Sequence, residues 1–165
     1  MTSSDAASIM QSSFAAITAK DLTALSATHH PDIVEDFIVL GPIEGKESVR
    51  AFFAELFAAV PDLVFEAESV MGVDATTAVG QWKMRGTFDG GPFQGIEPTG
   101  RVIDLRGIDV MVFEDGLLRH NTIYYDGLSF ARQVGLLPAA GSRADRGMLA
   151  TFNAAAKAKS RLRRS

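Results

Sequence analysis

The sequence predicts an α+β fold in which a strongly curved, mostly antiparallel sheet wraps around N-terminal helices. Two observations lead to this prediction. Apolar residues recur every three or four positions in residues 1–60, whereas residues 63–125 alternate apolar with polar side chains between turn signals. Helices this short cannot cover both faces of four long strands. We therefore expect the sheet to curve and to enclose a concave interior that can hold a ligand.

The N-terminal third predicts three helices and one strand. Asp21 is a good N-cap for the second helix, and Pro31 ends that helix because the residue before a proline is pushed out of the helical region. Pro61 stops the third helix. In chain order, the pattern predicts a helix between Ser4 and Lys20, a helix at Leu22–Thr28, a strand at Ile33–Leu40 and a helix at Lys46–Val60.

Residues 63–125 predict four strands. The run Glu114-Asp115-Gly116 is a strong hairpin signal, and the glycine- and proline-marked stretch 89–100 predicts a long turn. A short helix at Leu128–Gly135 closes the body, and the alanine-rich segment Ala140–Lys159 predicts another helix. The strands themselves are expected at Leu63–Met71, Thr77–Phe88, Arg101–Phe113 and Leu117–Tyr125.

Composition narrows the class of protein. The chain has 165 residues, enough for one domain, and its 47% hydrophobic and 22% charged residues are ordinary for a soluble globule. It has no cysteine, which excludes disulfides, thiolate metal sites and cysteine nucleophiles. The net charge of -4 argues against nucleic-acid binding, and no apolar stretch approaches the ~20 residues of a membrane span. The N-terminus shows no secretion signal, so we expect a cytoplasmic protein.

The charge is unevenly distributed along the chain. From Arg143 onward there are seven basic residues against one acid, whereas the preceding part carries 9 basic and 19 acidic residues. We therefore expect two units, a folded domain at residues 1–139 and a helical basic tail at residues 140–165. The basic cluster from Lys157 to Arg164 is either a solvated helix end or a surface that binds an acidic partner, such as a second subunit.

Two acids interrupt apolar runs. Asp36 lies within Ile33–Val39, and Asp109 lies within Ile108–Phe113. A carboxylate in such a run is costly to bury unless it is paired, hydrogen-bonded or neutralised. Each acid therefore occupies either an outward-facing or edge position, or a functional position inside the expected cavity.

These acids lie in segments that resemble a known family. The resemblance is to the ketosteroid isomerases of the nuclear transport factor 2-like superfamily, and it is carried by residues 21–36, 45–53 and 108–116. It spans about residues 9–138 and implies a cone-shaped curved sheet plugged by helices. It also implies that Asp36 is a general base that removes a proton next to a carbonyl, and that Asp109 is a neutral acid that stabilises the enolate.

The chain departs from the isomerases on its first helix. The place of their oxyanion-hole tyrosine is Ser13 or Phe14, and a phenylalanine cannot donate a hydrogen bond. Tyr125 is a substitute donor from another direction, because the predicted register places Asn121, Ile123 and Tyr125 on the cavity side of the last strand.

A second resemblance is to the SnoaL-like polyketide cyclases of the same superfamily. It is carried by the long excursion Arg85–Arg101 and by Tyr125-Asp126 followed by Arg132–Leu136. The resemblance implies an aldol ring closure that uses an acid on the last strand. In this alignment the place of that acid is Ile123 and the place of the accompanying histidine is Asn121, so neither family's full catalytic set is present.

Three hypotheses about function follow. The first is a cofactor-free acid–base enzyme, a cyclase or isomerase, that acts next to a carbonyl on a hydrophobic polyketide- or steroid-like substrate, with Asp36 as base and Asp109 as acid. The second is a non-catalytic protein of the same fold that binds a small hydrophobic molecule. The third is an interaction module that binds a protein through its convex sheet face or its tail. The pocket residues expected for the first two are Phe14, Phe53, Phe57, Trp82, Asn121 and Tyr125.

Neither a metal nor a cofactor is expected. The chain has three histidines and no spaced carboxylate pair, and the adjacent His29 and His30 are expected to cap a helix end. From the superfamily resemblance we expect a homodimer that forms through the sheet, with no nucleic-acid partner and no membrane span.

Overall fold

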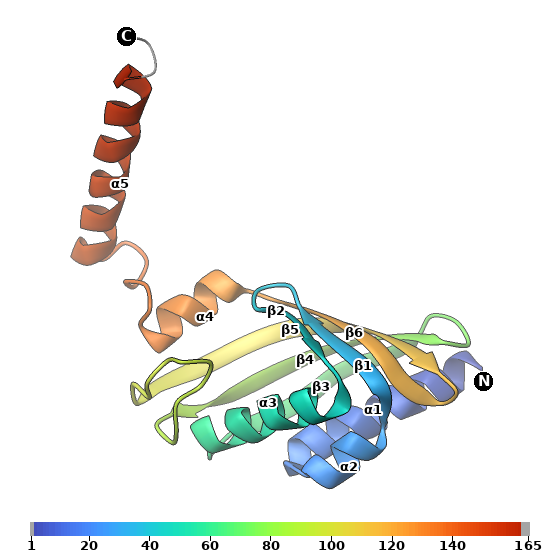
Figure 1. The fold of residues 1–165 in the computed structure, drawn as a ribbon. Coiled ribbons are helices and arrows are strands. Elements are labelled where there is room, and N and C mark those ends of the chain that lie inside the picture. Colours follow the sequence, from blue (N-terminus) through green and yellow to red (C-terminus); the bar gives the residue numbers. More distant parts are fainter. Residues whose placement is uncertain (1, 163–165) are drawn as a thin grey trace.

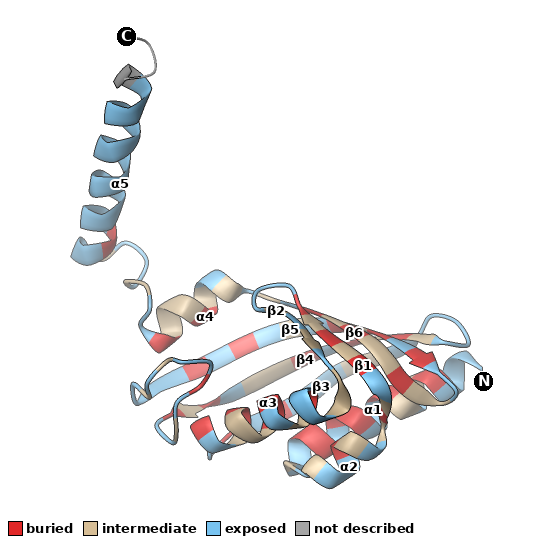
Figure 2. Cartoon of the chain, in the orientation of Figure 1, coloured by how far each residue is buried: buried red, intermediate tan, exposed pale blue. Residues whose placement is uncertain are grey.

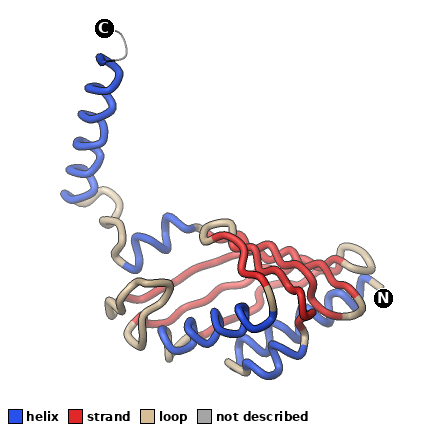
Figure 3. The backbone as a smooth tube through the Cα atoms, in the orientation of Figure 1, coloured by secondary structure: helices blue, strands red, loops and turns tan. Residues whose placement is uncertain are grey.

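The computed structural model describes residues 2–162 (Figure 1). These residues form five helices and one sheet of six strands. The helices are α1 (Ser3–Ala19), α2 (Leu22–Ala27), α3 (Lys46–Ala59), α4 (Gly127–Val134) and α5 (Arg143–Leu162). The strands are β1 (His29–Phe37), β2 (Gly41–Glu44), β3 (Val64–Gly72), β4 (Thr77–Phe88), β5 (Arg101–Glu114) and β6 (Leu117–Tyr125). The α+β prediction is confirmed, and Figure 3 shows the strands as one curved layer that does not close on itself.

The strand order in the sheet is β2-β1-β6-β5-β4-β3. Neighbouring strands pair antiparallel except for β1 and β6, which run parallel and bring Glu35 opposite Asn121. Parallel neighbours need a long connection, and here that connection contains α3 and the three other long strands. The centre of the sheet therefore joins residues that are distant in the sequence.

One predicted turn is a strand in the structure. Gly41, Pro42 and Gly45 are turn-forming residue types and predict a turn here, but Gly41–Glu44 forms the edge strand β2, which pairs with β1. Gly41 has a φ of 93°, a value that favours glycine and lets the chain reverse after β1. The predicted strand Ile33–Leu40 accordingly ends earlier, at Phe37.

Helices α1 and α3 cover the concave face of the sheet (Figure 1). α1 packs against β3 and β4, and α3 packs against β1. Gly80 on β4 permits this close approach, because a Cβ at that position would lie 2.6 Å from Cε2 of Phe14 on α1. The side chains between the helices and the sheet form one apolar core, whose residues are coloured red in Figure 2.

Helix α5 extends away from the body of the molecule (Figure 1). Of its side chains at positions 143–160, all are exposed except Asp145, and Phe152 is 68% exposed. Asp145 forms an ion pair with Arg132 of α4 at 3.6 Å and accepts a hydrogen bond from the backbone N–H of Gly141. The body thus holds α5 at its first turn. Within residues 2–162, no helix has the length and apolar character needed to cross a membrane.

Candidate active site

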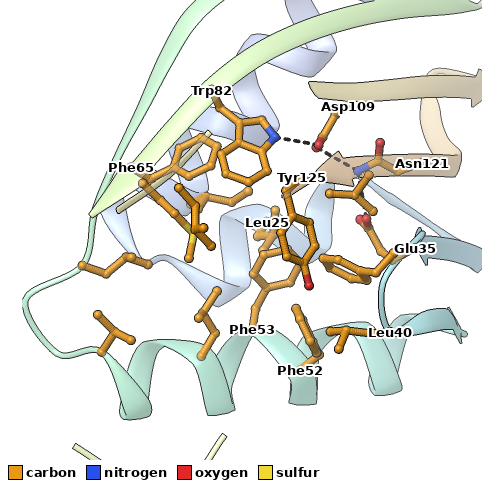
Figure 4. A pocket seen from close by; sticks show the side chains of 18 of the residues that line it. Leu25, Glu35, Leu40, Phe52, Phe53, Phe65, Trp82, Asp109, Asn121 and Tyr125 are labelled. Atoms are coloured by element: carbon orange, nitrogen blue, oxygen red, sulfur yellow. Dashed lines mark hydrogen bonds between the residues drawn. The ribbon is translucent and has the colours of Figure 1, made fainter. Parts of the chain in front are cut away.

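A cavity of about 90 Å³ lies between the concave face of the sheet and the helices that cover it (Figure 4). Most of its wall is apolar, and much of that wall is aromatic, as at Phe52, Phe53 and Phe65. A wall of this kind excludes water and favours a hydrophobic ligand. The polar residues that line the cavity are Ser13, His29, Glu35, Asp109, Asn121 and Tyr125.

Two buried acids in this cavity share one amide. Nδ2 of Asn121 donates a hydrogen bond to Oε2 of Glu35 at 2.8 Å and another to Oδ2 of Asp109 at 3.0 Å. The indole Nε1 of Trp82 donates to the other Asp109 oxygen, Oδ1, at 2.7 Å. Glu35 is 3% exposed and Asp109 is 5% exposed. The four side chains therefore form one hydrogen-bonded row inside an apolar wall.

The pairing of neighbouring strands brings these four side chains together. Glu35 lies opposite Asn121 across the parallel β1–β6 pair, and Asp109 is paired with Ile123, two residues beyond Asn121 on β6. Trp82 is paired with Gly107 on β5, two residues before Asp109. A Cβ on Gly107 would lie 2.2 Å from Cζ2 of Trp82. The missing side chain thus leaves room for the indole against β5, from where its N–H donates to the acid.

Burial raises the pKa of both acids. The pKa of Glu35 rises to about 8, because the carboxyl group loses its hydration and lies near the charge of Asp109, while the hydrogen bond from Asn121 opposes the rise. Burial also raises the pKa of Asp109 to about 6, against hydrogen bonds from Asn121 and Trp82 that favour its charged form. The two carboxyl groups therefore titrate as a coupled pair, in which burial favours the protonated form of each.

The structure places the two acids predicted from the sequence on different faces of the sheet. Asp109 lines the cavity, but Asp36 does not, and Asp36 is only half-buried. Successive side chains of a strand point to opposite faces, so the position next to Asp36, Glu35, is the one that enters the cavity. The expected pair Asp36 and Asp109 is therefore not brought together, and the pair that is brought together is Glu35 and Asp109.

Four of the six expected pocket residues line the cavity, namely Phe53, Trp82, Asn121 and Tyr125. The two others, Phe14 and Phe57, do not. Phe14 is buried against Gly80 and packs edge-on against Phe65, so its ring fills the space behind the wall. Phe57 is partly buried and contacts the ring of Phe53 from outside the cavity. Ser13, the alternative to Phe14 as the place of the isomerase tyrosine, does line the cavity.

Glu35 and His29 line the cavity, although the sequence did not predict either of them there. On β1, the sets Ile33-Glu35-Phe37 and Val34-Asp36-Ile38 each contain two apolar residues and one acid, so alternation alone does not tell which set faces inward. His29 was expected to cap a helix end, but it is the first residue of β1 and its side chain lines the cavity. Its neighbour His30 instead accepts a hydrogen bond at Nδ1 from the backbone N–H of Asp32.

In the part of the chain that the structure describes, no group of three or more histidine, aspartate or glutamate side chains is placed to hold a metal ion. The chemistry that the site offers is that of two coupled carboxyl groups in an apolar surrounding. Such an arrangement can donate one proton and accept another without contact with bulk water.

Comparisons with known proteins agree with this fold. The family model described as SnoaL-like polyketide cyclase matches residues 7–134. A candidate SnoaL-like polyketide cyclase from Jannaschia sp. CCS1 is 25% identical with a TM-score of 0.72, over 82% of this chain and 94% of that one. TsrD from Streptomyces laurentii is 27% identical with a TM-score of 0.69, over 81% and 97% of the two chains.

A third solved structure, AclR from Streptomyces galilaeus, described as a candidate hydroxylase, is similar in fold. It is 21% identical with a TM-score of 0.68, and the match covers 95% of this chain and 93% of AclR. No curated protein matches the chain.

Proposed function

Because the chain belongs to the SnoaL-like polyketide cyclase family of nuclear transport factor 2-like proteins, we propose that it is a cyclase or isomerase that moves protons next to a carbonyl group. The observation that carries this proposal is the pair of buried acids, Glu35 and Asp109, held by one amide in an apolar cavity. The aromatic wall suits a hydrophobic polyketide- or steroid-like substrate. Both the acid and the base come from the chain, so the proposed reaction needs no cofactor.

The two acids have different hydrogen bonds and therefore different proposed roles. Both oxygens of Asp109 accept hydrogen bonds, which stabilises its carboxylate form. Oε1 of Glu35 accepts none from the described residues, so it is the oxygen free to meet a ligand. Glu35 also has the higher pKa, because it is fully buried beside Asp109. Glu35 is thus the proposed proton donor to the carbonyl oxygen, and Asp109 is the proposed base.

The proposed step keeps the proton count of the pair constant. The C–H bond next to the carbonyl breaks as its proton moves to Asp109, and the carbonyl oxygen takes the proton of Glu35. The product is an enol. Return of a proton to a different carbon gives isomerisation, whereas attack of the enol carbon on a second carbonyl of the same molecule closes a ring.

A non-catalytic ligand-binding protein is the second candidate function. It is favoured by Ile123, which stands where the resemblance to the cyclases places their last-strand acid and which is a buried apolar residue. A binding protein would take up a hydrophobic ketone in the same cavity without exchanging its protons. The two candidates therefore differ in the rate at which the protons of a bound ketone exchange with solvent, and this rate can be measured.

Deuterium exchange into 1-tetralone, a bicyclic ketone, separates the two candidates. In buffered D₂O near neutral pH, an acid–base enzyme should exchange the protons on the carbon next to the carbonyl faster than buffer does, which ¹H NMR measures directly. Because general acid–base groups typically contribute about 10²–10⁴-fold, the acceleration should be easily resolved. Binding of 1-tetralone without faster exchange would contradict the enzyme proposal and support the binding protein.

We also propose a homodimer that forms through the outer face of the sheet. Ile108, Val112 and Tyr124 lie on that face and are between 38% and 49% exposed, and Ile108 is paired with Tyr124 across β5 and β6. Burying such a row against a second copy removes apolar surface from water. Helix α5 lies outside this surface, and Arg163 and Arg164 of the basic cluster fall outside the described residues.

Removal of residues 140–165 is expected to leave both the fold and this dimer intact. Asp145 is the one buried side chain of α5 at positions 143–160, so the melting temperature should change by only a few degrees. Sedimentation velocity should give the same dimer mass for the truncated and the full chain. As a control, Phe130→Ala in α4 removes a buried ring and should cost about 3–5 kcal/mol. A truncated chain as unstable as this control, or a monomeric one, would contradict a domain boundary at residue 139.

A further inference from the structure

His29 is a buried polar side chain whose ring has no partner. It is 1% exposed, and neither Nδ1 nor Nε2 has a hydrogen-bond partner among the described residues. A buried imidazole without partners costs free energy, and native proteins satisfy nearly all such groups. The ring lines the same cavity as the two acids. Nothing in the proposed proton transfer uses it.

The ring of His29 is neutral. Burial, together with the nearby charge of Lys46, lowers the pKa of His29 to about 4. Lys46 does not satisfy the ring, because its Nζ donates to the backbone oxygen of His29 at 3.3 Å. A neutral imidazole offers one N–H donor and one nitrogen acceptor. A hydroxyl group, which can donate and accept, is a suitable partner for such a ring.

The position of His29 separates it from the acids along the cavity. His29 is paired with Leu118 and Glu35 with Asn121, and these two partners lie three residues apart on β6. On β5 these partners lie opposite Phe113 and Met111, two residues apart, because the pairing of β5 with β6 is irregular between them. At ~3.3 Å per residue, the backbone positions of His29 and Glu35 are therefore on the order of 7 Å apart along the sheet. A fused-ring ligand can span that distance through the apolar part of the cavity.

We propose that His29 is a specificity-determining residue that binds a hydroxyl group of the ligand remote from the reacting carbonyl. This inference rests on the proposed function and adds a second anchor point to it. The ligand is then a hydrophobic ring compound with at least two oxygen functions, one at Glu35 and one at His29. A ligand that lacks the remote hydroxyl leaves the imidazole unpaired and binds more weakly.

The test compares two ketones and three forms of the protein. Titration calorimetry gives the Kd of 1-tetralone and of 6-hydroxy-1-tetralone for the full wild-type chain and for His29→Phe. Wild type should bind the hydroxylated ketone about threefold to tenfold more tightly, as one neutral hydrogen bond allows. In His29→Phe this preference should disappear, and in His29→Gln, which keeps a donor and an acceptor, it should partly return.

A second measurement does not depend on the stability of any variant. In wild type labelled with ¹⁵N at histidine, the ring nitrogens of His29 should shift when 6-hydroxy-1-tetralone binds and much less when 1-tetralone binds. Equal affinities of wild type for the two ketones, including no measurable binding of either, would overturn the inference. A hydroxyl preference that persists in His29→Phe would also overturn it. Failure of the proposed function is a different result, since it appears as absent deuterium exchange in wild type.

Discussion

Glu35→Gln should lower the rate of deuterium exchange into 1-tetralone at least about 100-fold, because the variant loses the proton donor to the carbonyl oxygen. Glutamine has nearly the same shape, but it cannot supply a proton at any pH. Asp109→Asn should cause a loss of similar size by removing the base. Since the two acids act as a pair on one proton, the double variant should be little slower than either single variant.

Asp36→Asn is the matched control for these variants. It makes the same chemical change at the adjacent position of β1, but its side chain lies outside the cavity, so exchange should continue at a rate close to that of wild type. Exchange rates are measured by ¹H NMR at equal protein concentration, and circular dichroism confirms that each variant is folded. If Asp36→Asn abolished exchange and Glu35→Gln did not, the role implied by the isomerase resemblance would be right and the present one wrong.

The free energy of unfolding of wild type should fall by several kcal/mol between about pH 4.5 and pH 8. Unfolded Glu35 loses its proton near pH 4.5, whereas folded Glu35 keeps it until its pKa of about 8. In this window the folded state binds more protons than the unfolded state, so stability decreases as pH rises, by about 1.4 kcal/mol per pH unit for each extra proton. The raised pKa of Asp109, about 6, adds to the decrease in the lower part of the window. The lowered pKa of His29, about 4, opposes the decrease up to about pH 6.5, because unfolded His29 binds a proton there and folded His29 does not.

Glu35→Gln should flatten this profile. The variant carries no ionisable group at position 35, so it should lose less stability than wild type above pH 6, where Asp109 no longer contributes. Urea denaturation at pH 5, 6.5 and 8.5 gives the three free energies needed. Asp36→Asn should keep the wild-type slope of unfolding free energy against pH, because the change leaves Glu35 in place and Asp36 is only half-buried on the other face of the sheet. Parallel profiles for wild type and Glu35→Gln would show that Glu35 is not buried as a neutral acid.

Local sequence signals were sufficient for most of the fold. The strands Thr77–Phe88 and Leu117–Tyr125 have the predicted bounds, because turn residues at 89–100 and at 114–116 mark their ends. The curvature of the sheet was predicted from helices too short to cover both faces of the strands, and the resemblance to the two families implied it as well. The edge strand β2 was missed because its four residues contain two turn formers, Gly41 and Pro42, and only pairing with β1 makes them a strand.

The candidate site was harder to predict than the fold. Asp109 was found because a single acid in the apolar run 108–113 is a strong signal on its own. Glu35 was missed because Glu35 and Asp36 are adjacent, and the choice between them depends on which face of β1 meets the helices. His29 was missed because its burial comes from a contact between β1 and β6, which no local pattern reveals.

The parallel pairing of β1 with β6 also determines when the site forms during folding. Glu35 and Asn121 are 86 residues apart in sequence, so their hydrogen bond requires closure of a long loop, which is entropically costly and slow. During synthesis β1 leaves the ribosome before β6. Until β6 docks, the Glu35 carboxyl group stays hydrated and has the ordinary pKa of a glutamate. The carboxyl group that we propose as the proton donor thus acquires its unusual affinity for protons only when the last strand docks.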